Sequence, residues 1–373
     1  MRCIFPLMIM LLSLLLTACE GQAPQNTTTI RVDQAMGGQP DPAFARALEP
    51  RAFQFPQDHG AHPEFATEWW YLTGNLRSEN GQHFGYQLTL FRVGLRPGQV
   101  QQDSSWRTNQ VYMGHLAISD IAAARHYSTE RFARAAAGLA GARLEPFEVW
   151  LGPWSMRADR KQSSFIVSAE QDDIGISLQL LPGNKRMILQ GERGLSRKSA
   201  TPGNASFYYS FTRLPTRGEI RVGDKFYTVE GNSWMDREWS SSALDKDQAG
   251  WDWFALQLDD GREVMYYQMR NKQGGAHAFS SGKLVEKDGR VHTLLPNQVM
   301  LMPSRYWQAR DGQRYPVKWS MQIAEHQLDL EVEAMFDDQL MDHTVRYWEG
   351  AVGVSGSHTG KGYLELSGYD SRE

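Results

Sequence analysis

The residue types best suited to chemistry gather in one segment of the second half of the chain. Asp236, Arg237 and Glu238 follow one another inside the string GNSWMDREW, residues 231–239. Three adjacent charges between Trp234 and Trp239 are costly to bury unless they are paired. If this segment faces a cavity, it predicts acid–base catalysis or recognition of a polar head group. The alternative, an ion-paired turn at a strand end, is equally open.

A second candidate segment is the aromatic string Trp251-Asp252-Trp253. On a strand, the two tryptophans point to one side and Asp252 points to the other. Tryptophan pairs are most often part of a core, but a cavity lined by Trp and Tyr also suits an apolar, unsaturated or cationic ligand. The candidate catalytic residues are therefore Asp236, Arg237, Glu238 and Asp252. The candidate ligand-binding residues of these two segments and of the expected return strand are Trp234, Trp239, Trp251, Trp253, Tyr266 and Gln268.

A third candidate is the string FPQDHGAHPE, residues 55–64, which is followed by EWWY at residues 68–71. His59 and His62, with nearby carboxylates, have the residue types of a metal site. Two histidines three apart in a loop of Pro and Gly do not share a helix face, so we expect no metal there. Instead, Asp58 and His59 should hydrogen-bond a loop that closes one end of a barrel. Asp58, His59 and Trp70 are kept as candidate ligand-binding residues.

Several other kinds of site have no sequence signal. The nearest approach to a G-x-S-x-G nucleophile motif is GVSGS at residues 353–357, which has Ser357 where the motif requires a glycine. The chain has no H-E-x-x-H string, P-loop or dinucleotide fingerprint, and we expect no cofactor. A net charge of −4 without a long basic stretch argues against a nucleic-acid partner.

These residues must be positioned mainly by strands. Apolar and polar residues alternate with period two at residues 84–90, 174–180 and 327–334. Short helices are expected at Asp41–Leu48 and at Ser128–Ala137, the latter with Ser128 as its N-cap. Many strands and few short helices predict an all-β barrel or sandwich. Hairpin turns are expected at Asn80-Gly81, Pro182-Gly183, Asp260-Gly261, Asp288-Gly289 and Asp311-Gly312.

A weak internal repeat suggests two copies of one barrel. Trp69-Trp70-Tyr71 leads to Asn80-Gly81 and then to Tyr86, and Trp251–Phe254 leads to Asp260-Gly261 and then to Tyr266. With the length of the chain, this pattern predicts two barrel domains, 51–220 and 221–373, with a boundary near residues 215–225.

The N-terminus predicts a membrane-anchored lipoprotein on the periplasmic side. Residues 1–18 combine a basic tip, a short apolar run and a Leu-x-Ala ending before Cys19, as in a lipoprotein signal peptide. Cys19 would be lipidated, and Glu20 after it slightly favours the outer membrane over the inner. Residues 19–50 would form a flexible tether, because residues 20–40 are rich in Gln, Thr, Asn, Gly and Pro. Cys3 and Cys19 are the two cysteines, so the mature chain would hold no disulfide.

Four long strings resemble one known family. FPQDHGAHPEFATEWWYLTGNL, GNSWMDREWSS, GWDWFALQLDDG and YWEGAVGVSGSHTGKGYLELSGY are similar to the tandem-lipocalin family of carotenoid hydratases (hydroxyneurosporene synthases) and AttH-like secreted proteins. The strings span Phe55 to Tyr369, nearly the whole mature chain. The resemblance implies two consecutive lipocalin-like antiparallel β-barrels, which agrees with the repeat. It also implies association with an ABC-type transporter.

The resemblance says less about the activity of this chain than about its fold. In the hydratases a His and a Trp, with a Tyr and an Asp, are held to protonate an alkene and guide water onto the carbocation. Trp239 matches the Trp and Tyr266 matches the Tyr. Arg237 stands at the His position and Gln268 at the Asp position, and neither can supply a proton near neutral pH. The departures at Arg237 and Gln268 argue against the mechanism that the hydratases use.

Three hypotheses follow. The leading one is a binding protein that holds a hydrophobic molecule, a lipid or isoprenoid, at the periplasmic membrane face. The second is a hydratase-like lyase, or another secreted enzyme, acting on an isoprenoid or lipid. The third is a structural accessory subunit of a membrane transporter.

Overall fold

The computed structural model describes residues 41–98, 104–159, 164–183, 187–242 and 244–369. The expected signal peptide (1–18), Cys19 and the tether up to residue 40 lie outside these residues. The described part consists mainly of antiparallel strands, and the expected all-β class is confirmed. Its helices are three 3-10 turns: η1 (Gln57–His59), η2 (Pro296–Gln298) and η3 (Ala324–His326). None of the helices in the described ranges is long and apolar enough to cross a membrane.

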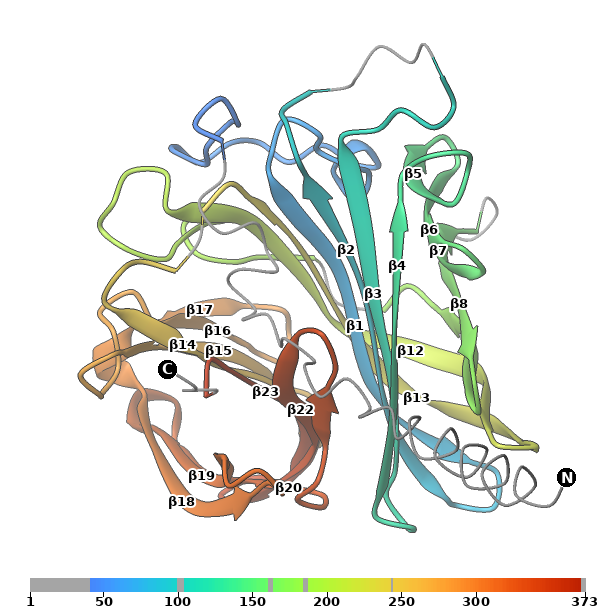
Figure 1. Ribbon diagram of the computed structural model, residues 1–373. Helices are drawn as coiled ribbons and strands as arrows, with labels where there is room; N and C mark the ends of the chain where they lie inside the picture. Colours follow the sequence, from blue (N-terminus) through green and yellow to red (C-terminus); the bar gives the residue numbers. More distant parts are fainter. Residues whose placement is uncertain (1–40, 99–103, 160–163, 184–186, 243, 370–373) are drawn as a thin grey trace, which may run out of the picture.

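The first sheet curls into a barrel whose main path runs β4-β3-β2-β1-β13-β12-β9-β8-β7-β6-β5 (Figure 1), with β10 and β11 also paired to β12. Its strands in the described residues are β1 (Thr67–Ser78), β2 (His83–Gly94), β3 (Gln110–Asp120), β4 (Arg125–Arg134), β5 (Ala140–Leu144), β6 (Phe147–Leu151), β7 (Trp154–Ala158), β8 (Phe165–Gln171), β9 (Ile174–Leu180), β10 (Ile188–Leu189), β11 (Leu195–Arg197), β12 (Ala205–Val222) and β13 (Lys225–Ser240).

The second sheet forms a smaller barrel along the path β17-β16-β15-β14-β23-β22-β20-β19-β18, with β21 paired to β22. Its strands are β14 (Gln248–Leu258), β15 (Glu263–Asn271), β16 (Ser281–Val285), β17 (Val291–Leu294), β18 (Met300–Gln308), β19 (Arg314–Ile323), β20 (Leu328–Ala334), β21 (Leu340–Asp342), β22 (Arg346–Gly356) and β23 (Gly360–Ser367). In Figure 1 this barrel is the orange and red ring.

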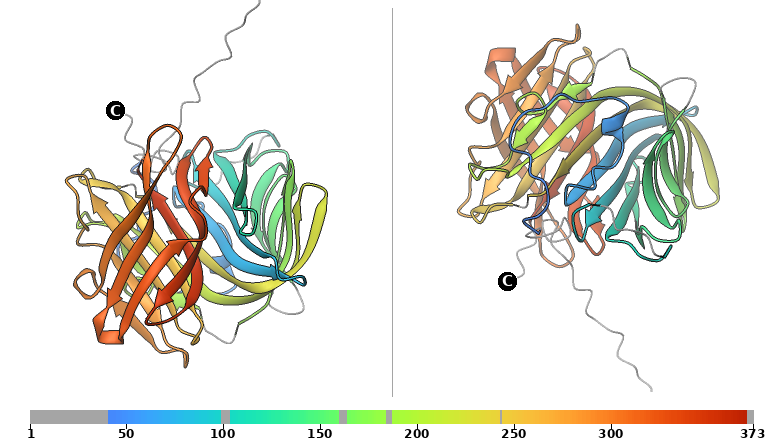
Figure 2. Two further views of the ribbon diagram at one scale, coloured as in Figure 1. Left: turned by 90° about the horizontal axis from the view of Figure 1, so that it is seen from below. Right: turned by 90° about the horizontal axis from the view of Figure 1, so that it is seen from above.

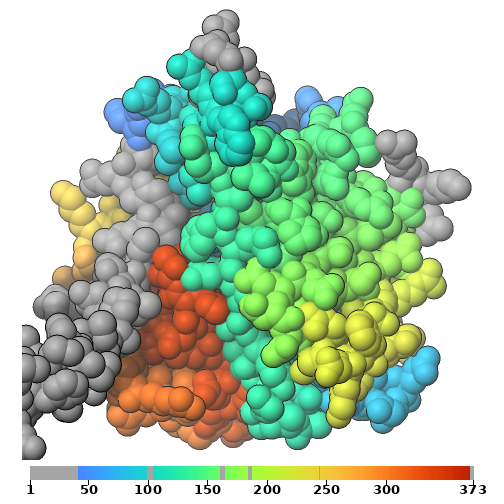
Figure 3. Space-filling view, turned by 45° about the vertical axis from the view of Figure 1, so that its right-hand side comes forward, coloured from blue at the N-terminus to red at the C-terminus, as the bar shows by residue number. Residues whose placement is uncertain are grey.

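Each barrel has its own apolar core, and a third cluster joins the two. The first core includes Trp70, Tyr86 and Trp154, and the second includes Tyr266, Trp319 and Trp348. The joining cluster takes residues from both barrels: Tyr71, Tyr208, Trp234, Trp253, Ala255, Met265, Tyr267, Met269, Ala351 and Tyr363. The barrels therefore lie side by side with outward faces in contact, as Figures 2 and 3 show.

The contact between the barrels is close. Gly85 on β2 leaves so little room that a Cβ there would meet the Tyr363 hydroxyl at 2.6 Å and the Ala351 Cβ at 2.8 Å. The Asn75 side-chain amide also donates to the Gly362 carbonyl at 3.1 Å. Strands β1 and β2 thus form a wall shared with β22 and β23 of the second barrel.

The change from one sheet to the other comes later than the expected boundary near residues 215–225. Strand β13 pairs with β1 from Ser78↔Val229 to Thr67↔Ser240, so the segment 221–240 completes the first sheet. The second sheet begins at Gln248. The expected boundary falls within the β12–β13 hairpin, whose long strands belong to one sheet. The expected tether also reaches too far along the chain, because Phe44 and Ala47, which were placed in it, are buried.

The repeated hairpin pattern corresponds to β1–β2 in the first barrel and β14–β15 in the second. In both, the turn glycine, Gly81 or Gly261, has a positive φ that a side chain would strain. The expected turns at Asp288-Gly289 and Asp311-Gly312 also join paired strands. Pro182-Gly183 does not, because the flanking strands β9 and β10 each pair with β12.

Neither expected helix forms. Residues 125–134 are strand β4, paired in register with β3 from Asp120↔Arg125 to Val111↔Arg134. The helix-favouring Ala and Arg residues there are overridden by the hydrogen bonds that β4 makes at the sheet edge. Asp41–Leu48 contains only a turn, in which the Phe44 amide donates to the Asp41 carbonyl at 3.0 Å.

A buried carboxylate ties together three neighbouring strands of the first barrel. Glu68 on β1 is fully buried and pairs with Arg92 on β2 and Arg237 on β13. The backbone amide of His62 donates to its two oxygens at 3.0 and 3.1 Å. Burial alone would raise the pKa of Glu68, but the two guanidinium groups hold it well below its usual range. Arg237 is therefore part of an internal ion pair, with its guanidinium 4.0 Å from the centre of the Trp70 ring.

We predict that Glu68→Gln destabilises the protein strongly. The substitution leaves two buried guanidinium groups without a countercharge, and breaking a buried pair in this way costs about 3–5 kcal/mol. The measurement is the urea midpoint of unfolding, followed by tryptophan fluorescence. Asp288→Asn, which breaks an exposed pair with Arg290, is the control and should leave the midpoint near wild type. A wild-type midpoint for Glu68→Gln would show that the carboxylate does not hold these strands.

Candidate functional site

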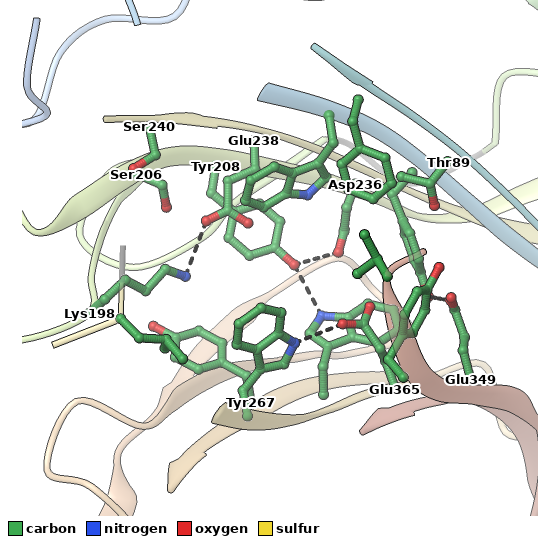
Figure 4. A pocket seen from close by; sticks show the side chains of 18 of the residues that line it. Thr89, Lys198, Ser206, Tyr208, Asp236, Glu238, Ser240, Tyr267, Glu349 and Glu365 are labelled. Atoms are coloured by element: carbon green, nitrogen blue, oxygen red, sulfur yellow. Dashed lines mark hydrogen bonds and ion pairs between the residues drawn. The ribbon is translucent and has the colours of Figure 1, made fainter. Parts of the chain in front are cut away.

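The candidate site is a cavity between the two barrels. Its volume is about 140 Å³, and the empty space between the atoms around it, open solvent included, is about 1170 Å³. Residues from both barrels line it: Trp69, Tyr71, Thr89, Phe91, Met113, His115, Lys198, Ser206, Tyr208, Asp236, Glu238, Ser240, Ser242, Leu244, Trp251, Trp253, Tyr267, Met269, Val345, Tyr347, Glu349 and Glu365. Figure 4 shows how their side chains converge from the strands of both sheets.

Strand alternation decides which residues reach this cavity. On β13, Asp236 and Glu238 point outward into it, whereas Arg237 and Trp239 point into the first barrel. On β14, Trp251 and Trp253 face the cavity, and Asp252 between them faces the interior of the second barrel. The cavity is thus lined by the outward faces of both sheets, which neither barrel could bury alone.

The walls are largely aromatic. Tyr71 and Trp253, from different barrels, meet edge to face with ring centroids 5.2 Å apart. Trp234 packs against Trp253 in the same geometry at 6.3 Å. Trp69, Trp251 and Leu244 line the cavity and are only partly buried. Such walls suit an apolar ligand and would also stabilise positive charge on it.

Asp236 is a buried acid on the first barrel's side of the cavity. It accepts hydrogen bonds from the Trp234 indole at 2.7 Å, the Ser210 hydroxyl at 2.5 Å and the Tyr208 hydroxyl. The Trp253 indole donates in turn to Tyr208 at 3.2 Å, which links the acid to the second barrel. Burial raises the pKa of Asp236 to about 7, although these hydrogen bonds act in the opposite direction.

Two further acids come from the second barrel. Burial raises the pKa of Glu365 on β23 to about 7, and the charges of Asp236 and Glu238 add to the effect, while a hydrogen bond at 2.8 Å from the Trp251 indole opposes it. Glu349 on β22 accepts a hydrogen bond from the Tyr71 hydroxyl. Burial raises the pKa of Glu349 well above its usual range, and the charge of Glu365 adds to the effect. One of its oxygens, Oε2, is buried without a hydrogen-bond partner.

The fourth acid, Glu238, has a cationic partner. Lys198 lies 3.2 Å from Glu238 and 4.3 Å from the centre of the Tyr267 ring. Although burial alone would lower the pKa of Lys198, the nearby Glu238 raises it above its usual value, so the ammonium group is charged. The other three acids of the cavity, Asp236, Glu349 and Glu365, form no ion pair with a described lining residue.

His115 adds a neutral base to the opposite wall. Its Nδ1 lies 2.7 Å from the Tyr347 hydroxyl, and its Nε2 lies 3.9 Å from a Glu130 oxygen. Burial lowers the pKa of His115 to about 3, so the imidazole is uncharged at neutral pH.

The structure brings together some of the sequence-predicted residues and separates others. Asp236, Glu238, Trp251 and Trp253 line the cavity, and Trp234 supports it from behind. Arg237, Trp70 and Trp239 belong to the first barrel's interior, where His62 stacks on Trp239 at 3.8 Å. The expectation that Arg237 would reach a ligand head group is therefore not met by this geometry.

In the second barrel, Asp252, Tyr266 and Gln268 also lie on the side away from the cavity. Asp252 pairs with Arg270 and accepts hydrogen bonds from Tyr369 at 2.8 Å and Gln268 at 3.4 Å. Tyr266 is in the second core. The register Trp253↔Tyr267 puts Tyr267, rather than Tyr266, on the cavity face.

Asp58 and His59 hold a loop against the first barrel. Asp58 pairs with Arg51 and His62 and accepts from the Gln54 amide at 2.6 Å. His59 Nδ1 lies 2.6 Å from the Tyr209 hydroxyl, and its carbonyl accepts from the Trp70 indole at 2.8 Å. Neither residue lines the cavity between the barrels.

Sequence reasoning missed the residues Lys198, Tyr208, Tyr267, His115, Glu349 and Glu365. A signal for Glu365 was present, because GYLELS alternates Tyr363 and Glu365 with Leu364 and Leu366. The leucines fill the second core, which leaves Glu365 outward. Of the described residues, the three that could together hold a metal ion are Glu286, His292 and His326, and none of them lines this cavity.

Solved structures with the same architecture cover most of the chain. An AttH protein from Nitrosomonas europaea is 32% identical, with a TM-score of 0.78 over 87% of this chain and 99% of that one. Kievitone hydratase from Nectria haematococca is 12% identical, with a TM-score of 0.62 over 88% and 99%. CghA, solved with Sch210972, is 11% identical, with a TM-score of 0.54 over 88% and 97%. The latter two show a shared fold.

The sequence comparisons agree with the resemblance expected from the strings quoted above. No curated protein matches the sequence. The family model described as AttH-like matches residues 46–369, which include both barrels and every residue of the cavity. The chain belongs to the AttH-like family.

Proposed function

We propose that this protein binds a mainly apolar small molecule between its barrels and catalyses addition or removal of water, as a hydro-lyase. The observation that carries the proposal is the pair Asp236 and Glu365. These acids come from different barrels, face one aromatic cavity, and both have a pKa raised to about 7 by burial. An ordinary surface carboxyl is ionised at neutral pH and has no proton to give.

A coupled pair of this kind can act as acid and base together. Since both pKa values are near 7 and the charge of Asp236 raises the pKa of Glu365, a state with one proton on the pair is populated near neutral pH. The protonated member would give its proton to one carbon of a double bond, and water would add to the other carbon. The ionised member would accept a proton from that water, so the pair ends with one proton, as it began. The reverse sequence removes water from an alcohol.

The aromatic walls supply binding and charge stabilisation. Burial of apolar ligand surface contributes roughly 25 cal/mol per Å², so an isoprenoid chain would be held without any specific polar contact. Ring faces of Trp251, Trp253 and Tyr267 would stabilise a developing carbocation. The chemical class that fits is thus a linear isoprenoid with an alkene or a tertiary alcohol.

The hydratase positions occupied by Arg237 and Gln268 do not decide this proposal. Both side chains point away from the cavity, into the first and second barrels respectively. The catalytic carboxyls proposed here are therefore different from the residues that the family resemblance implied. Kievitone hydratase shares the fold and its name describes a hydration, which is compatible with this chemistry.

A second candidate is a binding protein without turnover. The three hydrogen bonds to Asp236 engage both of its oxygens, which favours a structural role over proton donation. In that case the same aromatic cavity would carry a lipid or isoprenoid. Lipidation at Cys19 would place either kind of protein at a membrane on the periplasmic side, where an ABC-type transporter could deliver or remove the ligand.

We predict that the mature protein incorporates heavy oxygen into a linear isoprenoid. Squalene, farnesene and lycopene would be incubated with it in H₂¹⁸O, and labelled tertiary alcohols detected by mass spectrometry. Asp236→Asn and Glu365→Gln should each reduce the rate at least about 100-fold, the usual contribution of a general acid or base. The rate should be highest near pH 7 and fall on both sides, because below that pH both acids are protonated and above it both are ionised.

The matched control is Glu331→Gln, which alters an exposed carboxylate paired with Lys318 on the second barrel and should keep full activity. Quenching of tryptophan fluorescence by the same compounds measures binding independently. Quenching that Trp253→Ala weakens, without incorporation of label, would contradict the enzyme and favour the binding protein. Turnover that survives both acid substitutions would place the chemistry elsewhere.

We also predict that Cys19 is required for membrane attachment. Cys19→Ser should accumulate as an uncleaved or mislocalised precursor, because lipoprotein processing acts on the lipidated cysteine. Radiolabelled fatty acid and membrane fractionation provide the measurement. Unchanged acyl labelling and membrane retention in Cys19→Ser would rule out the proposed anchor.

A further inference from the structure

The second barrel has a seam that no strand pairing closes in the described residues. Its hydrogen-bonded path begins at β17 and ends at β18, and these two strands follow each other in the chain through η2. On one side of the seam, the β16–β17 turn precedes β17 in the chain. On the other side, β18 pairs with β19, and β19 is followed directly by η3.

Three side chains of the types that can ligate a metal ion lie together beside this seam. Glu286 lies in the β16–β17 turn, His292 lies on β17, and His326 ends η3. Their ligand atoms all lie within 4.8 Å of one another. The two imidazole rings are 4.5 Å apart between centroids, and His292 Nε2 is 3.4 Å from a Glu286 oxygen. All three residues are partly exposed, so an ion could enter from solvent.

We propose that Glu286, His292 and His326 bind a divalent transition-metal ion, with Zn²⁺ as the best match, which clasps the seam of the second barrel. Two imidazole nitrogens and one carboxylate oxygen form a common Zn²⁺ ligand set, with a water molecule in the fourth position. Mg²⁺ and Ca²⁺ instead prefer all-oxygen ligands. This proposal is independent of the chemistry assigned to the cavity between the barrels.

The surrounding charges are compatible with a bound cation. Glu325 adds negative charge beside the site, where it accepts a hydrogen bond from the Gln298 side chain of η2 at 2.8 Å. Arg262 opposes binding, but its charge is paired with Asp260. His358 lies 3.6 Å from the same Asp260.

A metal ion bound at this site would stabilise the seam of the second barrel. The ion would join Glu286 and His292 on the β17 side to His326 on the β19 side, a connection that the sheet does not supply through hydrogen bonds in the described residues. Binding to the folded state alone stabilises that state by mass action.

The test uses chelator-treated, tag-free mature protein and ZnCl₂. Calorimetric titration should give one equivalent of Zn²⁺ per chain, with a rise in Tm and slower amide exchange in β17 and β18. His292→Ala and His326→Gln should each weaken Zn²⁺ binding by more than about tenfold. His277→Ala, which removes a partly buried histidine outside the cluster, is the control and should bind as wild type. Binding should weaken from pH 7 to pH 5, because protons compete with Zn²⁺ for the ligand atoms.

Either of two results would overturn the proposal. One is the absence of saturable Zn²⁺ binding by the wild-type protein. The other is binding that the His292→Ala and His326→Gln variants retain at wild-type affinity. Circular dichroism of both variants shows whether they are folded. A third variant, Glu286→Gln, changes a residue in a turn and leaves both imidazoles in place.

Discussion

A single buried carboxylate, Glu68, determines how the central strands of the first barrel are arranged. By pairing with Arg92 and Arg237 it links β2, β1 and β13 side by side and draws Arg237 into the barrel. Because neighbouring residues of a strand face opposite ways, an inward Arg237 requires Asp236 and Glu238 to face outward. The charge pairing inside one barrel therefore determines which acids are presented to the other.

The packing of the second barrel against the first then buries Asp236 and raises its pKa. On an isolated first barrel, the strand face that carries Asp236 would be in water. Covered by Trp253, Glu365 and the other residues of the joined faces, Asp236 loses hydration, and its pKa rises to about 7. The tandem arrangement thus creates an acidic, aromatic cavity that neither barrel has by itself.

Much of this arrangement could be predicted from the sequence. Period-two alternation predicted the strands at residues 84–90, 174–180 and 327–334, and four of the five expected hairpin turns are present. The Trp-rich repeat predicted two barrels. The same alternation correctly grouped Trp251 with Trp253 and set Asp252 apart. Predictions failed where they depended on which face of a strand is covered and by what. Tyr266 was chosen instead of Tyr267 because pairing register is not visible in composition, and Arg237 was assigned to a ligand because its partner Glu68 is distant in sequence.

The central claim is that two carboxyls, one from each barrel, hold protons near neutral pH between the barrels. The most direct measurement is an NMR pH titration of protein labelled with ¹³C at the Asp and Glu side-chain carboxyl carbons, with assignments from Asp236→Asn and Glu365→Gln. The account predicts that the resonances lost in these two variants titrate near pH 7 in the wild-type protein, far above ordinary carboxyls. Titration of both resonances near pH 4, with the other surface acids, would contradict it.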